Sequence, residues 1–199
     1  MRKGVRNERS LRLLIRKLAD SVMQPTAIKR LQDILQGDGT KITRDTIGSY
    51  LDYLHESYLT FGISSFTDSV SQRESVKKRY LYDNGILNLF LFLPETKLLE
   101  NLVAIKLYNK YGDDLYYYNK NVEVDFCVPN DGLLIQASYR MIDEATRNRE
   151  IGALQKLSKF IKPQRCIIVT YDQEEIVQSN DLDVQIEVIP AYKFMLMAL

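Results

Sequence analysis

The 199-residue chain has no tryptophan, only one histidine and only two cysteines, and these scarcities exclude several classes of protein. With His55 alone, and no Ser or Cys in a nucleophile-elbow motif, the sequence argues against Ser-His-Asp and Cys-His hydrolases. Cys127 and Cys166 lie in apolar, strand-like runs without the spacing of metal ligands. We therefore expect buried thiols in a reducing compartment, with no disulfide and no zinc site.

Long apolar runs are also missing. The longest stretches, such as residues 86–93, are far too short to cross a bilayer. The basic N-terminal residues 1–9 are not followed by an apolar run, so we do not expect them to form a signal peptide. The hydrophobic content of 45% and charged content of 27% are typical of a folded globular protein. We expect a cytoplasmic protein with no membrane partner.

Charge is balanced over the whole chain but not along it. Lys and Arg number 27 against 26 Asp and Glu, yet residues 1–44 have eleven Lys and Arg against four Asp and Glu. A local excess of positive charge favours a nucleic-acid or acidic partner. The alternative is an amphipathic helix whose basic face is simply solvated.

The first part of the chain has the pattern of three helices followed by a hairpin. Apolar residues at helical spacing predict a first helix through residues 11–18 and further helices over residues 27–35 and 44–57, with Thr43 as the N-cap of the third. Residues 59–63 and 77–82 alternate as two strands should. This order is that of a winged helix. The apolar positions that carry the first and third helices are Leu11, Leu14, Ile15, Leu18, Ile47, Tyr50, Leu51, Leu54 and Tyr58.

In a winged helix the third helix can enter the DNA major groove while the hairpin touches phosphates. The cations on these elements are therefore the candidate nucleic-acid contacts. However, Asp45 and Asp52 share the exposed face of the third helix and oppose a phosphate backbone, so a protein-interaction role stays open. The candidate contacts are Lys41, Arg44, Arg73, Lys77, Lys78 and Arg79.

The second part has the order of an α/β domain with a central mixed sheet. An apolar helix is expected over residues 97–111, then strands over 115–118, 121–128 and 133–139, with a tight turn at 129–132. A helix over 143–160 follows, with Ile151, Leu154, Leu157 and Phe160 facing inward. Strands over 165–170 and 184–189 and a short C-terminal helix complete the prediction, in which Glu174 and Glu175 form a solvated loop.

This part resembles the PD-(D/E)xK restriction-endonuclease-like fold. The resemblance implies a helix Glu, a strand Asp and an acid-x-Lys on the next strand around Mg²⁺, a cation that prefers carboxylate oxygens. In this sequence Glu100 is the helix acid and Asp125, within Glu-Val-Asp-Phe, is the strand acid. The acid-x-Lys positions hold Gln136 and Ser138.

Those two substitutions predict a degenerate, inactive site. Gln136 offers a metal only a neutral carbonyl, and Ser138 supplies no positive charge to a phosphate. We expect no bound metal, with Glu100 and Asp125 as the only candidate ligands. The alternative is a Mg²⁺-dependent DNA nuclease in which Gln136 is a ligand and Arg140 is the substitute cation.

Taken together, the motifs resemble the C-terminal region of a prokaryotic family of AAA-type ATP-binding proteins. They are Tyr-Leu-Tyr-Asp-Asn-Gly-Ile-Leu-Asn, Leu-Leu-Glu-Asn-Leu-Val-Ala-Ile-Lys-Leu, Glu-Val-Asp-Phe and Leu-Leu-Ile-Gln-Ala-Ser-Tyr, in this order. In that family a P-loop ATPase domain precedes a winged helix and a nuclease-like domain. No Gly-x-x-x-x-Gly-Lys-Ser/Thr loop occurs here, so the resemblance places ATP only on an absent ATPase domain and implies a fragment.

The sequence thus predicts a winged helix over residues 1–80 and a nuclease-like domain over residues 81–199. The expected function is non-catalytic, with DNA or a protein as partner. The alternative is assembly, in which the basic helices dock on the ATPase domain of the same protein. Oligomeric state is left open.

Overall fold

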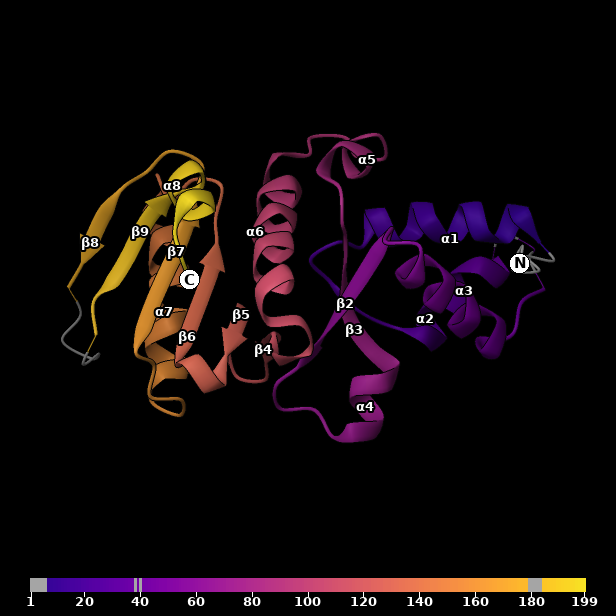
Figure 1. Ribbon diagram of the computed structural model, residues 1–199, viewed down its shortest axis with the longest axis horizontal. Coiled ribbons are helices and arrows are strands. Elements are labelled where there is room, and N and C mark those ends of the chain that lie inside the picture. The colour runs from indigo at the N-terminus through magenta and orange to yellow at the C-terminus, as the bar shows by residue number, and fades with distance from the viewer. Residues whose placement is uncertain (1–6, 38, 40, 179–183) are drawn as a thin grey trace. The chain divides into compact units, whose positions relative to one another are not determined.

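A computed structural model describes residues 7–37, 39, 41–178 and 184–199. The chain forms two compact units (Figure 1). The first comprises Met1–Ser64 and Asp68–Pro94, and the second comprises Ser65–Thr67 and Glu95–Leu199. The first unit therefore ends later in the chain than the boundary predicted at residue 80. The α/β class is confirmed, and no helix in the described ranges has the length and apolarity needed to cross a membrane.

The first unit contains the three predicted helices α1 (Glu8–Asp20), α2 (Ile28–Gly37) and α3 (Arg44–Glu56). Thr43 is the N-cap of α3 as predicted, because its side chain accepts a hydrogen bond from the Thr46 N–H. One inward position is wrong: Tyr58 is 77% exposed, since α3 ends at Glu56 and Tyr58 has a φ of 55°. The buried side chains that join the helices are Leu14, Leu18, Leu31, Leu35, Ile42, Ile47, Tyr50 and Leu54.

A three-stranded antiparallel sheet completes this unit. Strands β2 (Thr60–Ser65) and β3 (Val76–Leu81) pair as the predicted hairpin. Strand β1 (Pro25–Ala27) was not predicted; it pairs with the other edge of β3 and gives the order β1-β3-β2. Two short helices were not predicted either, α4 (Val70–Ser75) between the hairpin strands and α5 (Asn84–Asn88) after them.

The second unit is built on a six-stranded mixed sheet in the order β4-β5-β6-β7-β9-β8. Pairs β4–β5, β5–β6 and β8–β9 are antiparallel, whereas β6–β7 and β7–β9 are parallel. The strands are β4 (Tyr116–Asn119), β5 (Glu123–Val128), β6 (Leu133–Ala137), β7 (Arg165–Thr170), β8 (Glu175–Val177) and β9 (Ile186–Pro190).

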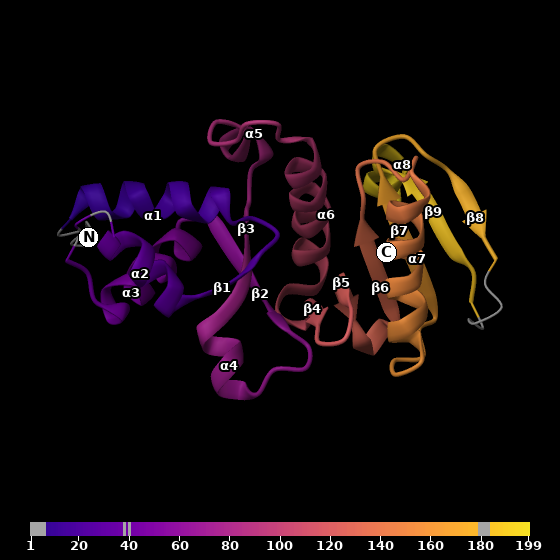
Figure 2. The same ribbon diagram turned by 180° about the vertical axis from the view of Figure 1, so that it is seen from behind.

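Helices cover both faces of this sheet. Helix α8 (Ala191–Leu196) lies in front of the strands in Figure 1 and α7 (Glu144–Ser158) lies in front of them in Figure 2, so the two cover opposite faces. Helix α6 (Glu95–Tyr111) packs on α8, and its Lys106 Nζ donates to the carbonyls of Met195 and Met197 at 3.0 and 2.7 Å.

The core of the second unit confirms the prediction of buried, unpaired thiols. Cys127 and Cys166 are fully buried and free, on β5 and β7. Phe160, predicted to face inward, is instead 73% exposed because α7 ends at Ser158. Glu175, predicted in a solvated loop, lies in β8 and forms an ion pair with Arg147 of α7.

Candidate functional site

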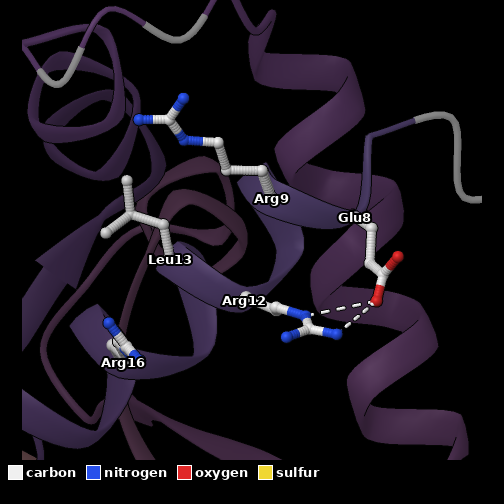
Figure 3. A pocket seen from close by; sticks show the side chains of 5 residues that line it. All are labelled: Glu8, Arg9, Arg12, Leu13 and Arg16. Carbon is white, nitrogen blue, oxygen red and sulfur yellow. Dashed lines mark hydrogen bonds and ion pairs between the residues drawn. The ribbon is translucent and has the colours of Figure 1, made fainter.

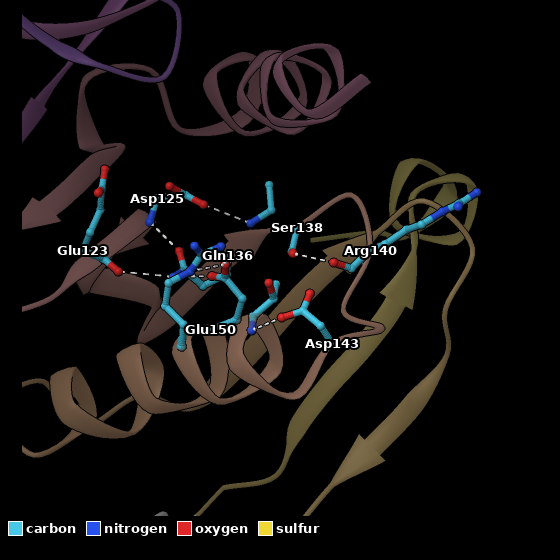
Figure 4. Close-up of polar contacts among 10 residues, drawn as sticks. Glu123, Asp125, Gln136, Ser138, Arg140, Asp143 and Glu150 are labelled. Atoms are coloured by element: carbon cyan, nitrogen blue, oxygen red, sulfur yellow. Dashed lines mark hydrogen bonds and ion pairs between the residues drawn. The ribbon is translucent and has the colours of Figure 1, made fainter. Parts of the chain in front are cut away.

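Strands β5 and β6 are joined by two side chains at the point where their regular pairing stops. The backbone register runs from Val128 opposite Leu133 to Phe126 opposite Ile135. Beyond it, the Asp125 N–H donates to Gln136 Oε1 at 2.8 Å, and the Ala137 N–H donates to Asp125 Oδ2 at 3.0 Å (Figure 4). Each side chain thus satisfies a backbone N–H of the neighbouring strand, which keeps the two strand ends together.

Gln136 is the centre of this arrangement. Its side-chain nitrogen donates one hydrogen bond to the Glu123 carbonyl at 3.2 Å and another to Glu150 Oε2 at 3.0 Å. With its oxygen accepting from Asp125, the amide uses both donors and one acceptor. Only 4% of the residue is exposed, so each of these bonds replaces a lost bond to water.

Glu150 on α7 is a buried member of the network that the sequence analysis missed. It is 6% exposed, and its Oε1 accepts from Arg149 Nε and Nη2 at 3.1 and 2.7 Å. Burial raises the pKa of Glu150, and the charges of Asp125 and Glu123 raise it further, while the Arg149 hydrogen bonds lower it. Helical spacing indicates this position, because Glu150 lies four residues before Leu154, which was predicted to face inward.

The other nuclease-like positions take different places. Ser138 is 6% exposed and its hydroxyl donates to the Arg140 carbonyl at 3.4 Å. The Arg140 side chain is exposed and points away from Asp125 and Gln136 (Figure 4), so it does not stand in for the missing Lys in this structure. Glu100 is buried in α6, and it is not among the described hydrogen-bond partners of Gln136.

The oxygens that could coordinate a magnesium ion here are engaged in hydrogen bonds within the protein. Asp125 Oδ2, the Gln136 oxygen and both Glu150 oxygens already accept hydrogen bonds from groups of the protein. Across the residues that the structure describes, no group of three His, Cys, Asp or Glu side chains is arranged to hold a metal. The hydrogen-bonded cluster of Asp125, Gln136, Arg149 and Glu150 joins β5, β6 and α7, and we call it the polar clasp.

Two of the predicted nucleic-acid contacts are exposed at the start of α3. Lys41, just before the helix, and Arg44, its first residue, are both exposed. Arg44 Nε donates to Gln32 Oε1 of α2 at 3.2 Å. Asp45 and Asp52 are exposed on the same helix, as expected, so the face has mixed charge.

The other four predicted nucleic-acid contacts lie in or next to the hairpin, and two of them are buried. Lys78 is fully buried and Arg79 is 8% exposed, so the prediction that the wing offers these two cations at its surface is wrong. Arg79 Nη1 donates to the Thr26 carbonyl of β1 at 2.9 Å. The physical reason is the missed strand: β1 makes β3 a central strand rather than an edge. Arg73 and Lys77, half-buried, remain near the surface.

Comparison with known proteins gives a family model and one relative. Residues 1–97 match a family model described as a domain of unknown function, DUF8612, and this region ends close to the end of the first unit at Pro94. "Uncharacterized protein MJ1544" of Methanocaldococcus jannaschii is 32% identical over 206 residues, which cover 98% of this chain. The chain spans 46% of that relative's length. No solved structure matches the chain.

Proposed function

We propose that this chain is a non-catalytic recognition region of an AAA-type ATPase family protein and that it binds DNA. The observation that carries the proposal is the clasp at Gln136. Gln136 stands at the position where a nuclease-like fold would have a metal-binding acid. Both of its side-chain N–H donors and its side-chain oxygen form hydrogen bonds within the protein. Such a group stabilises the fold and leaves the domain to bind its partner without cutting it.

The arrangement of the first unit supports a winged helix. Its order is α1, β1, α2, α3, β2 and β3, and the short first strand pairs with the last strand of the hairpin. In a winged helix α3 would be the recognition helix, and Lys41 and Arg44 are exposed at its start. Such cations bind phosphates without selecting a sequence.

The second unit supports a nuclease-like ancestry. A helix, three antiparallel strands, a helix and a parallel strand follow one another as α6, β4, β5, β6, α7 and β7. Asp125 and Gln136 lie on adjacent strands at the same end of this sheet. A surviving Mg²⁺-dependent nuclease would have to displace the bonds that these side chains make.

A second candidate function is assembly with another part of the same protein. It is favoured by the length of the relative, more than half of which lies outside the matched region. In that case the basic helices of the first unit would dock on an ATPase domain, and DNA would not be the partner.

The experiment is a titration of labelled duplex and single-stranded DNA at low and moderate salt. Phosphate contacts make binding weaken with salt, with a slope of about −0.9 per contact in a log–log plot for duplex DNA. We expect K41E/R44E to weaken binding and to flatten that slope. The matched control is K156E/K159E, which reverses two exposed cations in the second unit. Binding that is absent in the unmodified chain would refute DNA recognition and favour assembly.

A further inference from the structure

The outward face of α1 carries three arginines. Arg9, Arg12 and Arg16 are all exposed, and their spacing of three and four residues places them along one side of the helix. The opposite side packs into the unit, since Ser10, Leu14, Leu18 and Ala19 are buried. The arginines are therefore fixed by a helix that is itself anchored in the core.

These arginines border a hollow of about 580 Å³, which Glu8 and Leu13 also line (Figure 3). Glu8 forms an ion pair with Arg12 at 2.6 Å, and both side chains are largely exposed. Arg9 points away from that carboxylate in Figure 3, and within the described part of the chain neither Arg9 nor Arg16 makes an ion pair. The hollow therefore keeps a net positive charge.

We propose that this arginine face of α1 binds the phosphate backbone of duplex DNA. The inference rests on the proposed function and assigns to it a surface separate from Lys41 and Arg44. Arg9 and Arg16 are seven residues apart, which is about 10 Å along a helix axis. One DNA strand presents a phosphate about every 3.4 Å of its axis, so several phosphates fall within that span.

The chemistry of the hollow favours phosphate over an acidic protein. Guanidinium groups bind phosphate oxygens through paired hydrogen bonds and remain charged at any physiological pH. A protein partner would need apolar or aromatic anchors at the centre of its interface. Among the described residues, Leu13 is the one apolar side chain that lines this hollow, and it is only half-exposed. A phosphate backbone requires no such anchor.

The test compares R9A/R16A with the control K156A/K159A in titrations of the full chain with duplex DNA. The control removes two exposed lysines from the second unit. Loss of two phosphate contacts reduces the salt slope by about 1.8, so between about 50 mM and 200 mM salt the unmodified chain loses roughly twelvefold more affinity than R9A/R16A. The control keeps the original slope. Circular dichroism of both variants serves as the check that they are folded.

Each other outcome overturns the inference in its own way. If DNA binds and both variants keep the original slope, the arginine face is not a phosphate site, although DNA recognition stands. If the unmodified chain binds no DNA, both the inference and the proposed function fail. If R9A/R16A abolishes binding to poly-glutamate but leaves DNA binding unchanged, the face recognises an acidic protein instead.

Discussion

Removing the side chain of Gln136 is the sharpest test of the polar clasp. In Q136A the Asp125 N–H, the Glu123 carbonyl and one oxygen of Glu150 lose their partner at once. A hydrogen bond contributes about 1 kcal/mol net, and each buried group left unsatisfied costs about 1–3 kcal/mol. We expect the free energy of unfolding to fall by about 3 kcal/mol.

Thermal unfolding followed by circular dichroism measures this loss. For a chain of this size about 1 kcal/mol corresponds to roughly 2–4 °C in Tm, so Q136A should unfold about 6–12 °C lower. The control is Q185A, because Gln185 is exposed and its loss should fall within about 0.5 kcal/mol. A Q136A protein as stable as Q185A would refute the view that this amide holds the strand ends together.

Replacing Gln136 with an acid separates hydrogen bonding from shape. Q136E keeps the size of the side chain but cannot donate to the Glu123 carbonyl, and it sets a second carboxylate at hydrogen-bond distance from Glu150. We expect Q136E to be less stable than Q136A near neutral pH and to recover as the pH is lowered. Equal stability of Q136E and the unmodified chain at neutral pH would contradict the described network.

Three further predictions concern the second unit. Burial raises the pKa of Glu150 above its ordinary 4.5, so the carboxyl loses its proton at a lower pH in the unfolded chain than in the folded one. The contribution of Glu150 to stability is therefore complete below about pH 4.5 and declines as the pH rises through the folded pKa. The free energy of unfolding, measured near pH 4.5 and near pH 7, should show this decline in the unmodified chain but not in E150Q. Burial raises the pKa of Cys127 and Cys166 to about 12, so a thiol reagent at pH 8 should label neither until the protein unfolds. Gly132 has a φ of 58° and a Cβ there would lie 2.9 Å from the Gln164 nitrogen, so G132A should cost about 1–3 kcal/mol in denaturant unfolding.

Outcomes against these three are equally concrete. A parallel pH dependence of the unmodified chain and E150Q would show that Glu150 does not titrate as a buried acid. Rapid thiol labelling of the folded protein would contradict the burial of both cysteines. An unchanged G132A protein would mean that the turn after β5 relaxes without cost.

The elements that the sequence predicts well are those with strong periodicity. Leu14 and Leu18 repeat at helical spacing, and Thr43 precedes its helix with a side chain that can cap it, so α1 and α3 follow from local chemistry. Apart from β8 (Glu175–Val177), which was predicted as a loop, the strands of the second unit are short apolar runs separated by turn residues, and they too could be assigned.

What the sequence could not predict depends on distant partners. Strand β1 has three residues and begins with Pro25, so nothing local distinguishes it from a break between helices. Its pairing with β3 determines the burial of Arg79. Helical spacing places Glu150 on the same side of α7 as Leu154, but its buried partner Gln136 lies on a different element and cannot be identified from the local sequence.

The measurement that tests the central claim most directly is incubation of supercoiled plasmid and duplex DNA with the unmodified chain and Mg²⁺, at protein concentrations that saturate binding. We expect salt-sensitive binding and intact DNA, with D125A giving the same result. Cleavage that disappears in D125A would contradict it, because the cluster around Gln136 would then be a working metal site rather than a clasp.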